Sequence, residues 1–590
     1  MLKFPYGFSD FNLIRTENYF YIDRTSHIPL IETAGHQLLF LRPRRFGKSL
    51  LLSMLENYYD VAKADEFNKL FGNLAIGKNP TPLHNKYLIM KWDFSNINAQ
   101  GTLEDIKHSI YNHINNTIEA FVDRYQHLWQ YQVKINPQDA LSSFQSSLIA
   151  IRQTPYRLYL LIDEYDNFAN EVMMGKGEIK PERYKTLTSA EGSLKAIFRT
   201  VKSATSGLGL ERVFITGASP ILLSDMTTAY NVAENIYFKK KFNDLCGFKE
   251  AELKAVLTQV IAECKLKPEY VEKAQSVMKA FYNAYSFSDM SNELIYNPTL
   301  VLYFLKNLQE DCKFPSQMLD ENLAMDLRKL TYLSRLPNGK AILKQALNGT
   351  PSLALFSVSN RFGIDDMLKI NQSNQFIISI LYYLGVLTLD GETALRKLRF
   401  KIPNLVVKKL YVEYLFEMLL PQDTEREQVR LLAEEFYQTV DLQPICDFMT
   451  QRYFKVFDNR DYKTANELTI KTAFLTVLFN DVWYMMDSEM PVERRYSDLS
   501  MIVRPDFRQT PLNNFLFEFK YLKLSEVKLT GNELKLLSME EVETLDLVQE
   551  KLAEAEQQLL DYQSSLEDLQ LISVVAVGFD RLVWKIVEFS

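Results

Sequence analysis

The sequence has 590 residues with a formal net charge of −7 at pH 7. Domains of ~100–200 residues predict three or four such units, and 47% hydrophobic residues give them enough apolar side chains for packed cores, which excludes a disordered chain. The acidic balance disfavours a protein that merely coats nucleic acid, but it does not exclude an enzyme that grips phosphates in one local groove.

The cysteines and apolar runs indicate where the protein works. Four cysteines lie far apart without a C-x-x-C pair, which argues against a zinc cluster or a disulfide framework and fits a reducing compartment. The N-terminus lacks the charged segment and apolar core of a signal peptide. The longest apolar run, 377–389, is shorter than the ~20 residues of a membrane helix. We therefore expect a soluble cytoplasmic protein that enters no membrane.

Residues 1–245 alternate short β-rich runs with amphipathic helical stretches. The strand candidates are nearly continuous apolar runs, typical of parallel strands that are buried on both faces. They are 37-QLLFL-41, 87-YLIMKWDF-94, 156-YRLYLLID-163 and 212-RVFITGA-218. The pattern predicts an α/β domain with a parallel sheet over residues 1–245.

Residues 246–450 are mostly helical in pattern, with clear amphipathic helices at 250–264 and 424–440. Within this region, residues 379–404 predict a helix followed by a β-hairpin that turns around Asp390-Gly391. A helix next to such a hairpin suggests a winged-helix-like element.

Residues 451–590 return to a mixed pattern and predict a second, C-terminal α/β domain. The expected elements are a helix at 464–480, strands at 498–504 and 515–522, a long helix near 540–568 and a strand at 571–579.

The stretch 41-LRPRRFGKSLLLSML-55 lies between the first predicted strand and a helix, the context of a phosphate-binding loop. Gly47 allows close approach of the backbone, Lys48 neutralises phosphate charge, and the Ser49 hydroxyl holds Mg²⁺. The position of the motif's first glycine holds Arg42, followed by Pro43. On this motif alone, an ordinary basic loop leading into a helix stays open.

A second predicted strand gives an independent test of whether the loop binds a nucleotide. The run 158-LYLLIDEYDNF-168 is an apolar strand that ends in adjacent carboxylates, so Asp163 is expected to hold Mg²⁺ and Glu164 to orient or deprotonate the attacking water. A third strand ends in Thr216, where a γ-phosphate sensor would lie. Together these matches predict an ATP·Mg²⁺ site, with Ser49 and Asp163 on the metal. The predicted ATP contacts are Arg45, Phe46, Gly47, Lys48, Ser49, Leu50, Asp163 and Thr216.

These stretches resemble the bacterial AAA-ATPase-like family. The resemblance runs from about residue 5 to beyond 410 through 19-YFYIDRTSHIPLIE-32, the loop, LLIDEYD, VFITGASPI, 243-NDLCGF-248, 295-IYNPTLVLYFL-305 and 400-FKIPNLVVKKLY-411. In that family the R-P-R-R-F-G-K-S form of the loop is usual, so the resemblance explains Arg42. It also implies a restriction-endonuclease-like C-terminal domain of the PD-(D/E)XK superfamily. The expected domains are an AAA/P-loop domain at 1–245, a helical lid or winged-helix-like region at 246–450 and a nuclease-like domain at 451–590.

The expected nuclease needs carboxylates around Mg²⁺ and a lysine near the nucleophilic water. In 515-FLFEFKYL-522, alternation places Glu518 and Lys520 on one strand face while the aromatic residues point the other way. An ordinary half-buried strand gives the same string, so this signal is weak alone. We expect Glu518 to bind Mg²⁺ and Lys520 to orient the water and stabilise charge on the phosphate.

The partner aspartate has two candidates, Asp498 and Asp506. If the strands pair about residue 509 or 510, Asp498 lies across from Lys520 or Tyr521, whereas Asp506 lies about five residues from Glu518 along the strand. This geometry favours Asp498, and 493-ERRYSDLSMIV-503 also resembles the family's stretch around its catalytic Asp. Glu467 and Gln558 are expected accessory residues, and for each of them a solvated helix face is the alternative.

The sequence therefore predicts an ATP-binding, ATP-hydrolysing protein coupled to Mg²⁺-dependent cleavage of nucleic acid, DNA rather than RNA. Its predicted catalytic residues are Glu164, Asp498, Glu518 and Lys520. The alternative is a nucleotide-controlled interaction or scaffold protein with an inactive nuclease-like domain, which the acidic charge favours. AAA-type sites often work between subunits, so a homo-oligomer also stays open.

Overall fold

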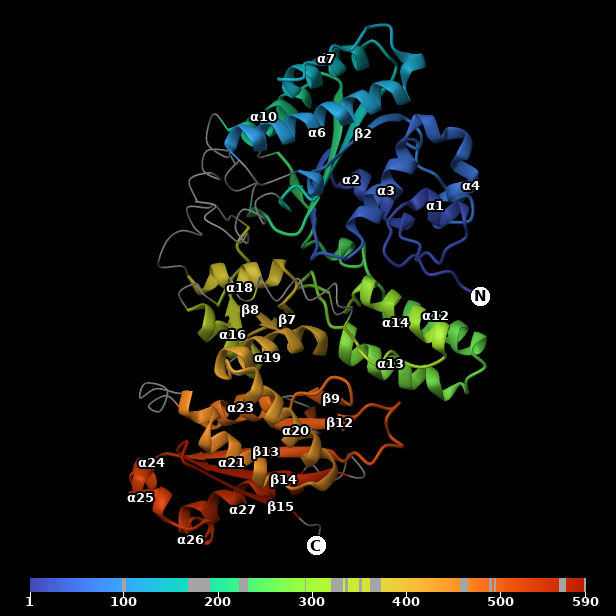
Figure 1. The fold of residues 1–590 in the computed structure, drawn as a ribbon. Helices are drawn as coiled ribbons and strands as arrows, with labels where there is room; N and C mark the ends of the chain where they lie inside the picture. The colour runs from blue at the N-terminus through green and yellow to red at the C-terminus, as the bar shows by residue number, and fades with distance from the viewer. Residues whose placement is uncertain are drawn as a thin grey trace.

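The structure is a computed structural model. It describes residues 1–97, 102–167, 192–221, 232–291, 293–319, 330, 333–334, 338–349, 353–360, 373–456, 465–487, 491–492, 495–561 and 569–587. Within these residues the chain forms two five-stranded sheets at opposite ends of the molecule, with helices and a three-stranded sheet between them (Figure 1).

The N-terminal sheet is parallel, with the strand order β2-β3-β4-β1-β5. Its strands are β1 Gln37–Leu41, β2 Tyr87–Asp93, β3 Arg157–Asp163, β4 Leu210–Gly217 and β5 Glu234–Asn235. The four predicted strands are confirmed to within two residues, because their apolar runs are buried on both faces of the sheet. β4 lies between β1 and β3, so Thr216 stands between the phosphate loop and Asp163.

Helices cover both faces of this sheet. On one face Tyr59 of α3 (Lys48–Tyr59) packs against Tyr159 of β3, with ring centroids 5.1 Å apart. On the other face Phe144 of α7 (Ala140–Arg152) packs against Trp92 of β2 at 5.2 Å. The remaining helices of this part are α1 Phe11–Thr16, α2 Ile28–Ala34, α4 Phe67–Phe71, α5 Ala75–Lys78, α6 Leu103–Arg124 and α10 Ser193–Ala204.

The middle region is helical, as predicted. Its helices are α12 Glu250–Glu263, α13 Glu269–Tyr282, α14 Pro298–Asp311, α16 Gly339–Asn348, α18 Asn374–Tyr383, α19 Leu405–Leu419, α20 Asp423–Thr439 and α21 Gln443–Gln451. Among them α12 and α20 confirm the helices predicted at 250–264 and 424–440. No helix among the described residues is both long and apolar enough to span a membrane.

The predicted hairpin exists, but its turn was placed wrongly. β7 (Thr388–Glu392) and β8 (Leu398–Lys401) pair through a turn at 393–397, where the Thr393 N–H donates to the Lys397 carbonyl at 2.8 Å. Asp390 and Gly391 lie inside β7 at a register shift, and the positive φ of Gly391 (71°) serves this irregularity. The short strand β6 (Leu353–Leu355) completes a sheet of order β6-β8-β7; the winged-helix element stays a prediction.

One disulfide was not expected. Cys264, at the end of α12, is bonded to Cys312, at the end of α14. Their sequence separation of 48 gives no short-range motif, so the spacing of the cysteines pointed away from a bond that the helix packing brings about. Cys246 and Cys446 are buried free thiols.

The C-terminal sheet has the order β15-β14-β13-β12-β9, with β13 and β14 parallel and the other pairs antiparallel. Its strands are β9 Tyr484–Asp487, β12 Leu499–Val503, β13 Asn514–Leu522, β14 Leu569–Val577 and β15 Arg581–Ile586, and a separate pair is β10 Pro491–Val492 with β11 Arg495–Tyr496. The helices are α23 Glu467–Leu478, α24 Leu524–Val527, α25 Gly531–Leu536, α26 Met539–Glu543 and α27 Asp546–Leu560.

The single long helix predicted at 540–568 is wrong. The chain breaks between α26 and α27, which lets Val542 and Val548 reach the same apolar cluster although their spacing would place them on different faces of one helix. Residues 562–568 lie outside the described residues.

Candidate functional site

The loop after β1 has the backbone of a phosphate-binding loop. Arg45 and Gly47 both have positive φ (65° and 84°), and Gly47 is the N-terminal cap of α3, with no side chain capping the helix. Free N–H groups at a helix N-terminus attract anions. Ser49 and Leu50 are half-buried in the first turn of α3. The loop therefore offers an anion site at the start of α3.

Arg42, in place of the motif's first glycine, has a structural role. It is only 2% exposed, and its guanidinium donates to the carbonyls of Tyr237 at 3.0 Å and Phe242 at 2.7 Å. The same group lies 4.0 Å from the ring centroid of Phe287. Burial lowers the pKa of Arg42 to about 10. Arg42 thus anchors the entry of the loop and points away from the anion site.

Lys48 is buried at the start of α3. Its ammonium donates to the carbonyls of Arg42 at 3.0 Å and Pro43 at 3.1 Å. Burial lowers the pKa of Lys48, and the carboxylates of Glu164 and Asp163 oppose that shift. The ammonium is therefore held at the loop by two neutral carbonyls, which a phosphate group can replace.

The polar residues at the ends of β3 and β4 meet beside the loop. The buried Thr216 hydroxyl donates to Asp163 Oδ1 at 2.6 Å, and the Glu164 N–H donates to the same oxygen at 3.0 Å. Glu164 has a positive φ of 46°, and burial raises its pKa while Lys48 and Arg44 lower it. Asp166 has a different task, because it accepts from the backbone N–H groups of Ala218 and Ser219.

Phe46 points from the loop into the middle region. It is fully buried and packs edge-on against Tyr285 and Phe287, at 4.9 and 5.2 Å, in a cluster that includes Ile295. Next to it, the Thr299 hydroxyl of α14 donates to the Arg45 carbonyl at 2.8 Å. The Phe46 side chain joins the loop to the middle region, and its expected contact with ATP stays a prediction.

We expect Phe46→Leu to lower the free energy of unfolding by ~1–2 kcal/mol, because the smaller side chain leaves a void among three neighbours. Urea denaturation of the whole chain measures this. Phe356→Leu is the matched control: Phe356 is 76% exposed, and its variant should unfold within ~0.5 kcal/mol of the parent. Equal effects of the two substitutions would contradict the cluster's contribution.

A cavity opens beside the loop at Gly47, with about 610 Å³ of empty volume including its mouth. Its walls are almost entirely apolar. They come from residues 20–22 of the N-terminal segment, Leu50 and Met54 of α3, residues 245–248, and Pro298 and Leu302 of α14. The cavity therefore joins three parts of the chain next to the anion site.

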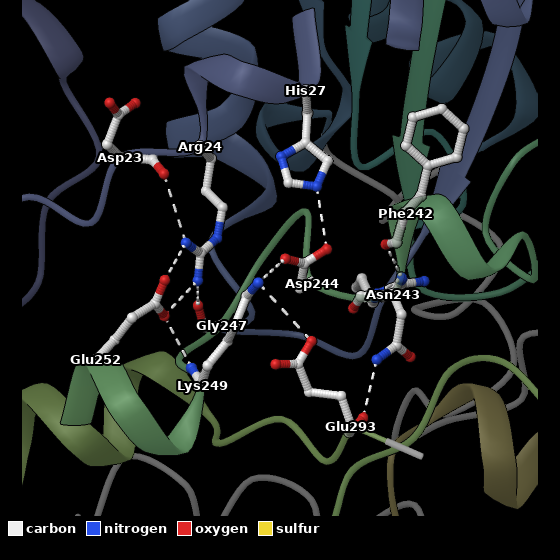
Figure 2. A network of polar contacts seen from close by, with 11 residues as sticks. Asp23, Arg24, His27, Phe242, Asn243, Asp244, Gly247, Lys249, Glu252 and Glu293 are labelled. Atoms are coloured by element: carbon white, nitrogen blue, oxygen red, sulfur yellow. Dashed lines mark hydrogen bonds and ion pairs between the residues drawn. The ribbon is translucent and has the colours of Figure 1, made fainter. Parts of the chain in front are cut away.

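Two residues that line this cavity, Arg24 and Gly247, belong to a polar network. Figure 2 shows the contacts of this network. Arg24 donates to both carboxylate oxygens of Glu252, at 2.6 and 2.7 Å, and to the Gly247 carbonyl at 2.7 Å. His27 Nε2 lies 3.0 Å from Asp244, which also pairs with Lys249 at 2.6 Å. Arg24 thus clamps the N-terminal segment to the start of the middle region, whereas its neighbours Asp23 and Thr25 accept hydrogen bonds from the Ala75 and Ile76 N–H groups of α5.

In the C-terminal domain, Asp498, Glu518 and Lys520 come together where β12 and β13 begin to separate. The Phe519 N–H donates to Asp498 Oδ2 at 2.9 Å, and Lys520 Nζ lies 3.2 Å from Glu518 Oε1. Phe519 faces the other side of β13 and packs on Phe474 of α23, so the predicted alternation is confirmed. Burial, followed by the charge of Asp498, raises the pKa of Glu518 to about 7, and Lys520 opposes that shift.

The strand register differs from the predicted one. Leu499 pairs with Phe517, so Asp498 lies opposite Glu518 and not opposite Lys520 or Tyr521. The connecting loop is wider than a tight hairpin because Arg504 is buried and donates to Asp506 at 2.8 Å and to the Val482 carbonyl at 2.8 Å. The Asp506 carboxylate is therefore paired with Arg504 and lies away from the cluster.

The accessory residues lie at the same cluster. Gln558 of α27 accepts from Lys520 Nζ at 2.6 Å. Glu467 as a whole is exposed at the start of α23, but neighbouring groups partly shield its carboxyl from solvent. This shielding and the charge of Asp498 raise the pKa of Glu467, and the charge of Lys520 lowers it. Two further residues were not predicted. Lys471 of α23 lies 3.8 Å from Asp498 Oδ1, and Glu554 of α27 lies 3.7 Å from Lys520. Lys471 lies four residues after Glu467 on α23, and Glu554 lies four residues before Gln558 on α27. This spacing places each pair on one helix face, and it is the sequence signal that could have identified Lys471 and Glu554.

The cluster offers two carboxylates to a cation. Among the described residues, no group of three or more His, Cys, Asp or Glu side chains is arranged to hold a metal ion. Glu518 is 7% exposed, however, and its buried Oε2 has no hydrogen-bond partner. Mg²⁺ commonly takes one or two carboxylates, with the remaining ligands from water and substrate phosphate. Asp498 and Glu518 therefore fit a divalent cation.

The comparison with protein families covers the N-terminal part. Residues 5–227 match the AAA-ATPase-like family model, described as "Predicted AAA-ATPase". This part of the chain is similar to that family, and its parallel sheet is consistent with the fold of a nucleotide-binding P-loop protein. The resemblance of this part is confirmed, and the C-terminal nuclease-like domain stays a prediction.

Three similar proteins cover much of the chain. The "Uncharacterized protein in vnfD 5′region" of Azotobacter chroococcum mcd 1 is 23% identical over 554 residues, which are 90% of this chain and 92% of that protein. The structure of the Walker-type ATPase of Pyrococcus abyssi is 15% identical, with a TM-score of 0.40, over 66% of this chain and 96% of its own. The Orc1 protein of Aeropyrum pernix in complex with DNA is 11% identical, with a TM-score of 0.24, over 69% and 98%.

Proposed function

We propose that this chain, with its AAA-ATPase-like domain, binds and hydrolyses Mg²⁺·ATP and uses the bound nucleotide to control phosphodiester cleavage of nucleic acid, DNA in preference to RNA, at its C-terminal cluster. The observation that carries the nuclease assignment is the meeting of Asp498, Glu518 and Lys520 around the unpartnered, buried Glu518 Oε2. A buried carboxylate oxygen without a protein partner is a position where a cation or an ordered water can bind.

At the nucleotide site, the backbone N–H groups of the loop and the Lys48 ammonium bind the phosphates. Ser49 and Asp163 are the residues that would hold Mg²⁺, which neutralises phosphate charge when bound. Glu164 orients the attacking water, and burial raises its pKa toward the range of a general base. Thr216, bonded to Asp163, is placed to report the γ-phosphate. The apolar cavity beside Gly47 receives the base and sugar.

At the C-terminal cluster, Asp498 and Glu518 are the residues that would hold Mg²⁺, which polarises the phosphodiester when bound. Lys520 orients the attacking water and stabilises the negative charge that develops on the phosphate. Gln558 and Glu554 hold the Lys520 ammonium from α27. These contacts fix the Lys520 side chain before substrate arrives.

The contacts of the loop supply a route between nucleotide and middle region. Phosphates that draw Lys48 away from the Arg42 and Pro43 carbonyls change the same loop that holds Phe46 among Tyr285 and Phe287. The middle region in turn lies between the two five-stranded sheets (Figure 1). A bound nucleotide can therefore bias the packing of the middle region against the loop.

We expect Leu302→Trp to weaken ATP binding about tenfold while leaving the binding of inorganic tripolyphosphate unchanged, because the larger side chain fills the cavity and leaves the loop intact. Isothermal titration with each ligand measures both affinities. Leu431→Trp, at a 61% exposed position of α20, is the matched control. An equal loss of affinity for ATP and for tripolyphosphate would mean that the cavity does not bind the nucleoside.

The decisive test is cleavage of plasmid DNA, single-stranded DNA and RNA with Mg²⁺ or Mn²⁺, with and without ATP. The Asp498→Ala and Lys48→Ala proteins are run beside the parent. Cleavage that disappears in Asp498→Ala, and that responds to ATP only when Lys48 is intact, is the expected result. ATP binding without cleavage of any substrate would overturn the nuclease assignment and favour a nucleotide-controlled scaffold.

A further inference from the structure

Lys471 is a buried lysine that the proposed reaction does not yet use. It lies one turn after Glu467 on α23, and the residue is only 5% exposed. Lysine is seldom this buried without a charged partner. Its partner is Asp498, whose Oδ1 lies 3.8 Å from Nζ. The other oxygen of Asp498 accepts from the Phe519 N–H. An ionised carboxylate has about four lone-pair positions, so both oxygens retain one for a further ligand.

The charges around Asp498 can be counted. Two buried or half-buried carboxylates, Asp498 and Glu518, face two buried ammonium groups, Lys471 and Lys520. Glu467 and Glu554 add two carboxylates at the exposed rim of the cluster, and Lys551, which pairs with Glu554 at 2.5 Å, adds a third ammonium group. With every group ionised the cluster carries one excess negative charge. One divalent cation leaves a single positive charge, and a second would leave three next to buried groups, which is costly.

We propose that the C-terminal cluster takes a single divalent cation, at Asp498 and Glu518, and that the Lys471 ammonium occupies the place of a second cation. The inference rests on the proposed function of this cluster. Two-metal sites hold their ions ~3.5–4 Å apart, commonly on a shared carboxylate. Here the carboxylate that two ions would share is Asp498, and the Lys471 ammonium, 3.8 Å from its Oδ1, already supplies a positive charge on that side.

Lys471 is thus a positioning residue for Asp498. Its charge also adds to that of Lys520 in attracting a phosphodiester. Removal of the charge has two opposite consequences. The cation binds more tightly, because a neighbouring positive charge is gone, while cleavage slows, because Asp498 and the phosphate lose a partner. Damage to the fold would lower both quantities together.

The test counts Mn²⁺ bound to the full chain without nucleotide, by isothermal titration and by electron paramagnetic resonance. The parent is expected to bind one Mn²⁺ that is lost in Asp498→Ala, with no spin-coupled pair in its spectrum. Lys471→Met is expected to bind Mn²⁺ about tenfold more tightly and to cleave more slowly. Lys471→Arg, which keeps the charge, should restore the parent affinity. Lys409→Met, which removes a lysine paired with Asp481 at 3.0 Å outside the cluster, is the matched control.

Two results would overturn the inference. One is a parent protein with two Asp498-dependent Mn²⁺ ions and a coupled spectrum, a measurement that needs no Lys471 variant. The other is a Lys471→Met protein that still binds the Asp498-dependent Mn²⁺ ion, but with the affinity of the parent. Neither result contradicts the proposed nuclease function. If Asp498→Ala binds as many Mn²⁺ ions as the parent protein, the C-terminal cluster holds no metal ion. The proposed nuclease function is then also wrong.

Discussion

Replacing Lys48 by alanine is expected to lower the affinity for ATP about 100-fold, or ~2.7 kcal/mol. The ammonium is buried at the first turn of α3, where its present partners are two neutral carbonyls. Phosphate oxygens are charged acceptors and form stronger hydrogen bonds than those carbonyls, so the lysine contributes much of its energy only when nucleotide is bound. Isothermal titration of Mg²⁺·ATP measures the loss.

Lys63→Ala is the control for this substitution, because Lys63 follows the C-terminal end of α3, the end away from the loop, and pairs with Glu66 at 2.8 Å. Its affinity for ATP should equal that of the parent. Thermal unfolding checks that Lys48→Ala is folded, since the substitution also leaves the Arg42 and Pro43 carbonyls without a donor. An ATP affinity within threefold of the parent would remove Lys48 from the nucleotide site.

Replacing Glu518 by glutamine is expected to lower the rate of nucleic acid cleavage about 10³-fold, or ~4 kcal/mol in activation free energy. Glutamine has the same shape as glutamate but no negative charge, so it cannot hold a divalent cation as a carboxylate does. Lys520 would keep its partner Gln558. The fold should persist, because the substitution adds no volume to the buried strand.

Single-turnover cleavage of the best nucleic acid substrate measures the rate, and Mn²⁺ titration measures the ion in the same protein. Glu556→Gln, on the exposed face of α27, is the control and should cleave as the parent does. A Glu518→Gln protein that cleaves at the parent rate would place the chemistry elsewhere on the chain.

Much of the nucleotide site was predictable because its signals are local. A strand that is buried on both faces must be apolar throughout, as β1 is. A loop that follows such a strand and approaches phosphate needs a glycine and a lysine at the start of the next helix, which here are Gly47 and Lys48. The role of Arg42 was not predictable from the loop. Its acceptors, the carbonyls of Tyr237 and Phe242, lie about 200 residues away, and only the folded chain brings them under the guanidinium.

The C-terminal cluster was predictable only in part for a similar reason. The alternation of β13 placed Glu518 and Lys520 on one face, but the two-residue error in register came from the loop that Arg504 and Asp506 shape. Lys471 stayed hidden within an apolar helix pattern, since its partner Asp498 lies 27 residues later, after β9, β10 and β11. Side-chain contacts between distant elements have no signature in either element alone.

The aromatic contact between the loop and the middle region has a consequence for how such a chain can be divided or inherited. A polypeptide that stops after residue 245 would retain the whole parallel sheet but leave Phe46 without Tyr285, Phe287 and Ile295. Arg24 would also lose Gly247 and Glu252. Such a fragment would expose apolar surface beside the phosphate-binding loop and tend to aggregate. Recombination between genes would therefore have to exchange the first ~300 residues as one module to preserve the packing around the loop.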